Sequence, residues 1–235
     1  MLFRSTYSMD FKQVAKDILG RTIEEHEGID ASVIQKKADT INITLPTTLF
    51  DFYATLGNNA LFVDGFQHFA QIDELVVNDN KLIFIQENQA VVYWAVDLED
   101  GQTIYQTTDH NFEGIVNWFK EDFTLNEFLE MLLYFQCVMS DDGYHEQVSS
   151  GFEFFASLDI ELYRLNLKTQ HFVASLEEKS KRTIKGRGYS ILWNPTTIVM
   201  YFTDAEGQAN EMILCCSKDK AFFDQLVADF EFSEL

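Results

Sequence analysis

Apolar residues recur at helical spacing in three segments near the start of the chain. A period of three to four residues predicts amphipathic helices over residues 11–19, 31–38 and 46–56. The first helix, which Gly20 ends, has an apolar face of Phe11, Val14, Ala15, Ile18 and Leu19. The face of the third helix is expected to consist of Leu49, Phe50, Tyr53 and Leu56.

The third helix has recognisable ends. Pro46, after Leu45, suits a first helical turn, because the N–H that proline lacks would have no partner there. Gly57 is expected to take the left-handed conformation that commonly ends a helix.

Short apolar runs separated by polar turns follow, and they predict an antiparallel set of strands. Residues 62–77 are otherwise expected to be irregular. The strands are expected at Glu74–Val77, Leu82–Ile85, Val91–Val96 and Thr103–Thr107. The turns between them are expected at 78–80, 86–89 and 97–101.

A capping box, Thr124-Leu-Asn-Glu127, predicts the start of a long helix that runs to about Met139. Asp141-Asp142-Gly143 is expected to end it and to mark a domain boundary. Beyond this point strands are expected at Phe152–Leu158, Tyr189–Trp193, Ile198–Phe202 and Met212–Cys216. A closing helix is expected to carry Phe223, Leu226, Val227 and Phe230 on one face.

The predicted fold class is therefore α+β, with a mainly antiparallel sheet flanked by helices. Residues 1–140 form the first domain. Residues 146–235 form a C-terminal sheet-plus-helix extension, which either stands apart or packs as part of the same domain.

Four short motifs occur in a fixed order within the first domain, and they resemble the SUKH superfamily of toxin-immunity proteins and fungal cell-wall-synthesis regulators. The resemblance covers about residues 10–140. Its cues are Leu45-Pro46, Gly57-Asn58-Asn59, Glu87-Asn88-Gln89 and Trp94, followed by Ile104-Tyr105-Gln106 and a helix from Leu125.

Most of these motif residues are expected to be structural. Trp94 in a strand is expected to be largely buried, and Asn88 and Gln89 are expected to hydrogen-bond backbone groups and fix the hairpin. Leu45, Pro46 and Gly57 shape the third helix. Glu87 is the motif residue expected to face a partner.

Charge is the strongest signal of the whole chain. The formal net charge is −21, and residues 40–140 carry only Lys81 and Lys120 against fifteen acidic residues, a net charge of −13. Such a field repels nucleic acid and anionic membranes and attracts basic partners. The alternative is that the acidity serves solubility alone.

Other features of composition point to a folded intracellular protein. The chain is 46% hydrophobic with 22 phenylalanines, and no apolar run approaches the roughly 20 residues that span a bilayer. The N-terminus shows no export signal. Cys137 is expected in a helix core, and Cys215 and Cys216 are adjacent, so one is expected to be buried and one exposed. A cytoplasmic location is expected.

No motif for catalysis, metal binding or cofactor binding is present. The five histidines are dispersed, and no phosphate loop, dinucleotide motif or nucleophile elbow occurs. The expectation is therefore a protein without metal or cofactor that is not an enzyme, although a carboxylate pair could always do acid–base work.

One stretch, residues 179–187, opposes the global charge with five basic residues in nine. It is expected to be a loop, with Gly186 and Gly188 loosening its backbone. It is either a solvated loop or a contact for an anion or an acidic partner.

The resemblance implies an immunity-type protein that binds a cognate bacterial toxin, such as a nuclease, and blocks its active or substrate-binding face. The alternatives are a regulatory or scaffold protein of the same fold and, third, an enzyme. Acidic residues in turns and helix starts are the candidate contacts to a basic toxin surface. These are Glu87, Asp97, Glu99, Asp100, Asp109, Glu113, Glu121 and Asp122.

Overall fold

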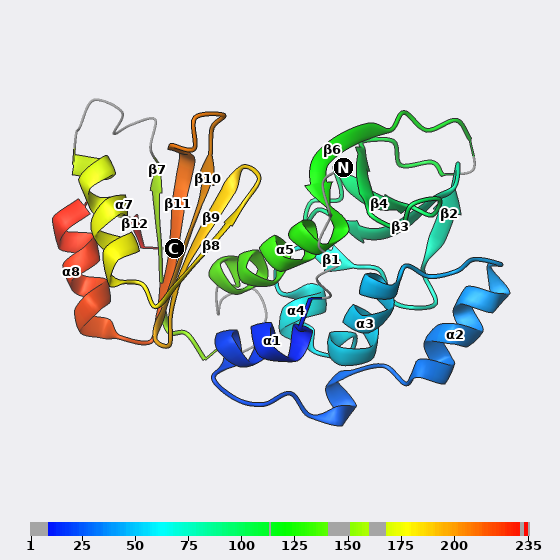
Figure 1. Cartoon of the computed structure of the whole chain (residues 1–235), viewed down its shortest axis with the longest axis horizontal. Helices are drawn as coiled ribbons and strands as arrows, with labels where there is room; N and C mark the ends of the chain where they lie inside the picture. The colour runs from blue at the N-terminus through cyan, green and yellow to red at the C-terminus, as the bar shows by residue number, and fades with distance from the viewer. Residues whose placement is uncertain (1–8, 113, 141–150, 160–167, 231–232, 235) are drawn as a thin grey trace, which may run out of the picture. The chain divides into compact units, whose positions relative to one another are not determined.

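The computed structural model describes residues 9–112, 114–140, 151–159, 168–230 and 233–234, and it has the expected α+β fold (Figure 1). The chain divides into two compact units. The first consists of the chain up to Asp17 with Arg21–Glu130, and the second of Ile18–Gly20 with the chain from Met131 onward. The boundary expected at Asp141–Gly143 lies outside the described residues, so the limits 140 and 146 stay a prediction.

The chain up to Met139 contains all the elements expected there. Its helices are α1 (Phe11–Leu19), η1 (Glu25–Glu27), α2 (Ala31–Thr40), α3 (Thr47–Leu56), α4 (Ala60–Asp64) and α5 (Leu125–Met139). Its strands are β1 (His68–Phe69), β2 (Val76–Asn78), β3 (Lys81–Gln86), β4 (Tyr93–Asp97), β5 (Thr103–Thr107) and β6 (Phe119–Thr124). The sequence did not predict η1, α4, β1 or β6, because such short or polar elements show no clear hydrophobic period.

The strands of this part form one antiparallel sheet in the order β1-β3-β4-β5-β6, with β2 also paired to β3. The predicted β3–β4 pairing is confirmed. The turn between β2 and β3 places Asp79 and Asn80 at φ 47° and 57°, the left-handed pair that a two-residue hairpin turn needs. Val91 was wrongly assigned to the buried strand, since it precedes β4 and is 49% exposed.

A chain of aromatic contacts runs through the core of the first unit. Edge-to-face and tilted ring pairs of this kind contribute roughly 0.5–1.5 kcal/mol each beyond their buried area. The ring-centroid distances are 5.8 Å for Phe11–Phe52, 4.5 Å for Phe52–Phe69, 6.2 Å for Phe69–Phe84, 6.2 Å for Phe84–Phe128 and 5.8 Å for Trp94–Phe128. These contacts link α1 and α3 to the sheet and to α5. Trp94 lies at the end of this chain, and most of its surface is covered, as expected.

Gly57 ends α3 for a different reason from the one expected. Its φ of −63° is right-handed, not left-handed. A Cβ at Gly57 would lie 2.6 Å from the carbonyl oxygen of Tyr53 and 2.7 Å from Cδ1 of Ile29. Gly28 is equally constrained, because its Cβ would lie 2.0 Å from the carbonyl oxygen of Ala54. Both glycines therefore allow the chain after η1 to pass directly against the end of α3.

Two details of α3 also differ from expectation. Pro46 occupies the N-cap, one residue before the first helical turn. Phe52 is fully buried, whereas Phe50 is only partly covered. Because Phe11 and Phe69 pack on its ring, Phe52 rather than Phe50 belongs to the aromatic chain.

The second unit is built on another antiparallel sheet, in the order β12-β7-β11-β10-β9-β8. Its strands are β7 (Phe154–Asp159), β8 (Arg182–Gly186), β9 (Tyr189–Asn194), β10 (Thr197–Thr203), β11 (Ala209–Ser217) and β12 (Ser233–Glu234). The helices α7 (Lys168–Lys179) and α8 (Lys220–Phe230) lie side by side on one face (Figure 1). Their shared core comprises Ala156, Leu158, Leu176, Leu192, Val199, Tyr201, Ile213, Cys215, Phe223 and Leu226.

Both neighbouring cysteines of β11 are fully buried, which corrects the expectation that one of them would be exposed. Cys215 belongs to the core under α7 and α8. Cys216 points to the other face, where its Sγ lies 3.9 Å from Sγ of Cys137 in α5. Burial raises the pKa of the Cys215 thiol to about 12 and that of Cys216 well above its usual value, so both stay protonated.

The basic stretch 179–187 was wrongly expected to be a loop, since most of it is strand β8, paired to β9. Gly186 does not loosen the backbone, because a Cβ there would lie 2.0 Å from the ring of Tyr189. Gly188, at φ 71°, forms the turn into β9.

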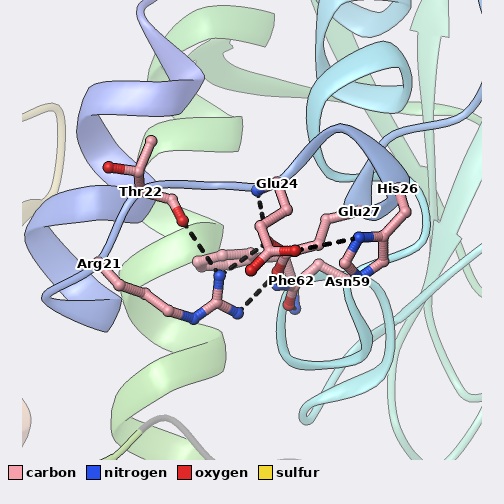
Figure 2. A network of polar contacts seen from close by, with 7 residues as sticks. All are labelled: Arg21, Thr22, Glu24, His26, Glu27, Asn59 and Phe62. Carbon is pink, nitrogen blue, oxygen red and sulfur yellow. Dashed lines mark hydrogen bonds and ion pairs between the residues drawn. The ribbon is translucent and has the colours of Figure 1, made fainter.

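The carboxylate of Glu27 joins three segments of the first unit (Figure 2). Arg21 donates two hydrogen bonds to it at 2.7 and 2.8 Å, the backbone N–H of Glu24 one at 2.7 Å, and the Asn59 side chain one at 2.6 Å. Glu27 is only 6% exposed. The hydrogen bonds from Arg21 outweigh the effect of burial and lower the pKa of Glu27 to about 2.

We expect Glu27→Gln to lower the free energy of unfolding by about 2 kcal/mol at pH 7, because charge-assisted hydrogen bonds are lost. The pKa of Glu27 is lowered from 4.5 to about 2, so its contribution is complete above pH 4.5 and is lost as the pH falls toward 2. Urea unfolding of both proteins across this range should show the difference between their free energies of unfolding (the gap) disappear as the pH falls. The exposed neighbour Glu25 provides the control Glu25→Gln, which should open no gap. A gap that stays constant with pH would contradict the assignment.

Candidate partner-binding surface

Most of the predicted acidic residues lie on strands β4 and β6 of the first sheet or in the connections on either side of β5. Tyr93 pairs with Thr107 and Thr103 pairs with Thr124. The β4–β5 turn and the end of β6 therefore lie at one end of the strands, and residues 108–118 lie at the other. For strands of this length the two ends are roughly 15–20 Å apart. We call Asp97, Glu99, Asp100, Asp109, Glu121 and Asp122 the acidic side.

In the β4–β5 turn, two of the three acidic residues hold the backbone. Asp97 Oδ1 accepts a hydrogen bond from the N–H of Glu99 at 2.8 Å. Asp100 accepts bonds at 2.8 Å from the N–H groups of Gln102 and Thr103 and one at 2.6 Å from the Thr103 hydroxyl. Desolvation alone would raise the pKa of Asp100, but these bonds lower it. Glu99 is exposed, and no hydrogen bond of its carboxylate occurs within the described residues.

The loop 108–118 is held by polar side chains at its base. Asp109 Oδ2 accepts from the backbone N–H of Asn117 at 2.7 Å and from its side chain at 3.2 Å. Asn78 of β2 donates to the carbonyl groups of Phe112 and Gly114 at 2.8 and 3.2 Å. The loop is thereby fixed to the sheet. Glu113, another predicted contact, lies outside the described residues.

Two large apolar side chains are exposed on this loop and at the start of β6. Ile115 is 97% exposed and Phe119 is 60% exposed. Sequence reasoning missed both, because an isolated apolar residue in a polar loop carries no period. An exposed apolar side chain on a loop that is already held in place is well suited to act as an anchor in a protein interface, because binding then costs little conformational entropy.

Strand β6 carries the remaining acidic pair. Its pairing with β5 is irregular: Lys120 lies opposite Tyr105 and Thr124 opposite Thr103, which leaves residues 121–123 facing Ile104. Such a bulge bends an edge strand and re-aims its side chains. Asp122 is exposed and Glu121 is half-buried.

Glu121 is held in a costly environment. Burial raises the pKa of its carboxyl group, and the neighbouring charge of Asp122 raises it further. The indole N–H of Trp94 donates a hydrogen bond to Glu121 at 3.2 Å, and this bond lowers the pKa. The net direction is upward. The fold therefore disfavours the ionised form of Glu121. Acidic residues in such environments are common at functional sites.

Glu87 does not lie with the other acids but in the β3–β4 loop. Its Oε2 accepts from the N–H groups of Gln89 and Val91 at 3.0 and 3.3 Å. The N–H of Asn88 donates to the Gln67 side chain at 2.8 Å. The loop is thus fixed by Glu87 and Gln67, whereas the sequence assigned that role to the Asn88 and Gln89 side chains.

The two lysines of residues 40–140 compensate the acidic side only in part. Lys81 contacts the rings of Tyr105 and Trp118 at 4.8 and 5.9 Å and the carboxylate of Asp79 at 3.2 Å, and its side chain is 12% exposed. Only Lys120 is exposed to solvent. The negative field inferred from the sequence therefore reaches the surface largely uncompensated.

Trp94→Phe should raise the pKa of Glu121 further, because the hydrogen bond that favours its charged form is lost. A carboxyl NMR titration of Glu121 measures this shift. Trp118→Phe provides a matched control, since it removes an indole bond of 3.3 Å to Asn78 on the same sheet. An upward shift in the Trp118 variant alone, or in neither variant, would contradict the role given to Trp94.

Within the described residues, no group of three His, Cys, Asp or Glu side chains is placed to hold a metal ion, and none of the helices has both the length and the apolar character of a membrane span. No protein-family model, curated protein or solved structure matches the chain.

Proposed function

We propose that this protein is a non-enzymatic immunity-type protein that binds a toxin with a basic surface and neutralises it. The observation that carries the proposal is the acidic side together with the exposed side chains of Ile115 and Phe119. The motif resemblance to the SUKH superfamily supports the immunity role, and the charge of −21 supports a basic partner.

The acidic residues differ in their hydrogen bonds and exposure, and this difference suggests which of them contact the partner. Asp97, Asp100 and Asp109 hold turns and present a rigid surface. Glu99 and Asp122 are exposed, and they pair with lysine or arginine side chains of the toxin. A nuclease needs such basic groups to hold phosphates, so an acidic protein that occupies them excludes the substrate.

The apolar and the charged residues act on different rate constants. Exposed charges steer the approach of the partner, so they set the association rate. Ile115 and Phe119 enter apolar pockets of the toxin, so their burial sets the residence time. The proposal therefore makes two separable kinetic predictions, to be measured with any toxin whose gene neighbours the gene for this protein.

Glu99→Lys with Asp122→Lys should slow association at least about tenfold at low salt and change dissociation little. The effect should shrink at high salt, because exposed charges are screened within about 8 Å at physiological ionic strength. Surface-plasmon kinetics at two salt concentrations measures both rates. The control, Glu25→Lys with Asp73→Lys, changes the net charge equally at exposed sites on other elements. Equal slowing of association by both pairs of substitutions would mean that the acidity acts only through net charge, which would contradict the proposed contacts.

Ile115→Ser with Phe119→Ser should speed dissociation roughly tenfold to a hundredfold and leave association nearly unchanged. Val33→Ser is the matched control, since Val33 on α2 is also an exposed apolar residue, at 47%. Protection of cells that express the toxin should fall as the residence time shortens. If the neighbouring toxin does not bind the wild-type protein at all, the immunity role fails and the regulatory or scaffold role replaces it.

A further inference from the structure

Strand β8 forms one end of the second sheet. The sheet order ends with β8, which pairs through Arg182–Gly186 with β9 only, and no other strand of the described residues adds to it (Figure 1). Thr183 and Lys185 are exposed. An edge strand of this kind presents unpaired backbone N–H and C=O groups, which are a template for another strand.

The charge around β8 is opposite to that of the chain. Residues 179–187 include five basic and no acidic residues in a protein of net charge −21. Lys185 forms an ion pair of 2.9 Å with Glu177 of α7, and Arg182 donates to the Tyr134 hydroxyl group. Lys179 and Lys181 are exposed and make no ion pair within the described residues.

The exposed residues of β8 and Lys181, which directly precedes it, lie on one face of the extended chain. Exposure alternates along the chain, so that Lys181, Thr183 and Lys185 are exposed while Arg182 and Ile184 are partly covered. The two lysines are four residues apart, which is about 13 Å along an extended chain. A partner strand whose acidic residues are also four apart can reach both.

A second copy of this chain is a poor occupant of the edge. In an antiparallel pair centred on Ile184, Lys181 of each copy would lie opposite Arg187 of the other, and like charges placed directly opposite are destabilising. A parallel pair would place Lys185 beside Lys185. Lysines on an edge strand commonly serve to prevent such self-association. The same charges attract an acidic strand.

We propose that β8 binds an extended acidic segment of another protein, which adds to the second sheet as a further strand. Backbone hydrogen bonds provide the affinity, and the Lys181–Lys185 spacing selects acidic residues four positions apart. This surface belongs to residues other than the acidic side, so the proposal is independent of the toxin partner. A single-stranded nucleic acid is the competing occupant, which the net charge disfavours.

The test uses the full-length protein and the synthetic peptide Thr-Glu-Val-Thr-Val-Glu-Thr with blocked ends. Amide hydrogen exchange by NMR should show β8 amides slowing about tenfold at saturating peptide, because newly paired amides are protected. The same peptide with N-methylated valines, which cannot pair fully, should give no protection. Slowed exchange with both peptides, or with neither, overturns the proposal.

Charge variants test the selection of acidic residues. Lys181→Gln with Lys185→Gln should weaken peptide binding about tenfold, since two charge-assisted contacts are lost. Lys12→Gln with Lys36→Gln removes two exposed lysines from α1 and α2 and should leave binding unchanged. Equal weakening by both pairs contradicts the proposal. So does protection of β8 by oligothymidylate as strong as that by the peptide.

Discussion

The chain of aromatic rings from α1 to α5 is the interaction on which the first unit depends. Phe52 of α3, Phe69 of β1 and Phe84 of β3 are each buried and touch the next ring in the series. Because close-packed interiors relax little, this series fixes which face of each helix and strand points inward. The loop 108–118 and the acidic residues belong to the strand ends and connections outside this aromatic series.

Close backbone approach is the second constraint, and it accounts for the motif Gly57-Asn58-Asn59. Gly28 and Gly57 let the η1 segment pass against α3, and Asn58 bonds to the carbonyl group of Gly28 at 2.7 Å. Asn59 caps α4 and bonds to the buried carboxylate of Glu27. The residues of this motif, whose sequence resembles that of a family, therefore each have a structural role in the fold of this chain. These reasons concern folding, and they say nothing of a partner.

The acidic residues of the first unit serve two purposes that charge alone cannot separate. Asp100 and Asp109 accept backbone hydrogen bonds and hold turns, whereas Glu99 and Asp122 are exposed. Glu121 lies between these roles, since it accepts one bond but stays in an environment that raises its pKa. In the proposed function, stability and binding therefore belong to different members of one acidic set, so substitutions should separate them.

Hydrophobic period and turn chemistry in the sequence determined α1, α3, the β3–β4 pair, the capping box of α5 and the strands β9 to β11, because each of these signals acts within a few residues. The −21 charge and the candidate acids also follow from sequence alone. Tertiary structure decided the rest. Four features depend on segments far apart in the chain: the burial of Cys216, the strand at 182–186, the close approach that requires Gly57, and the exposure of Ile115. Contacts between such segments have no local period, so only the folded chain shows them.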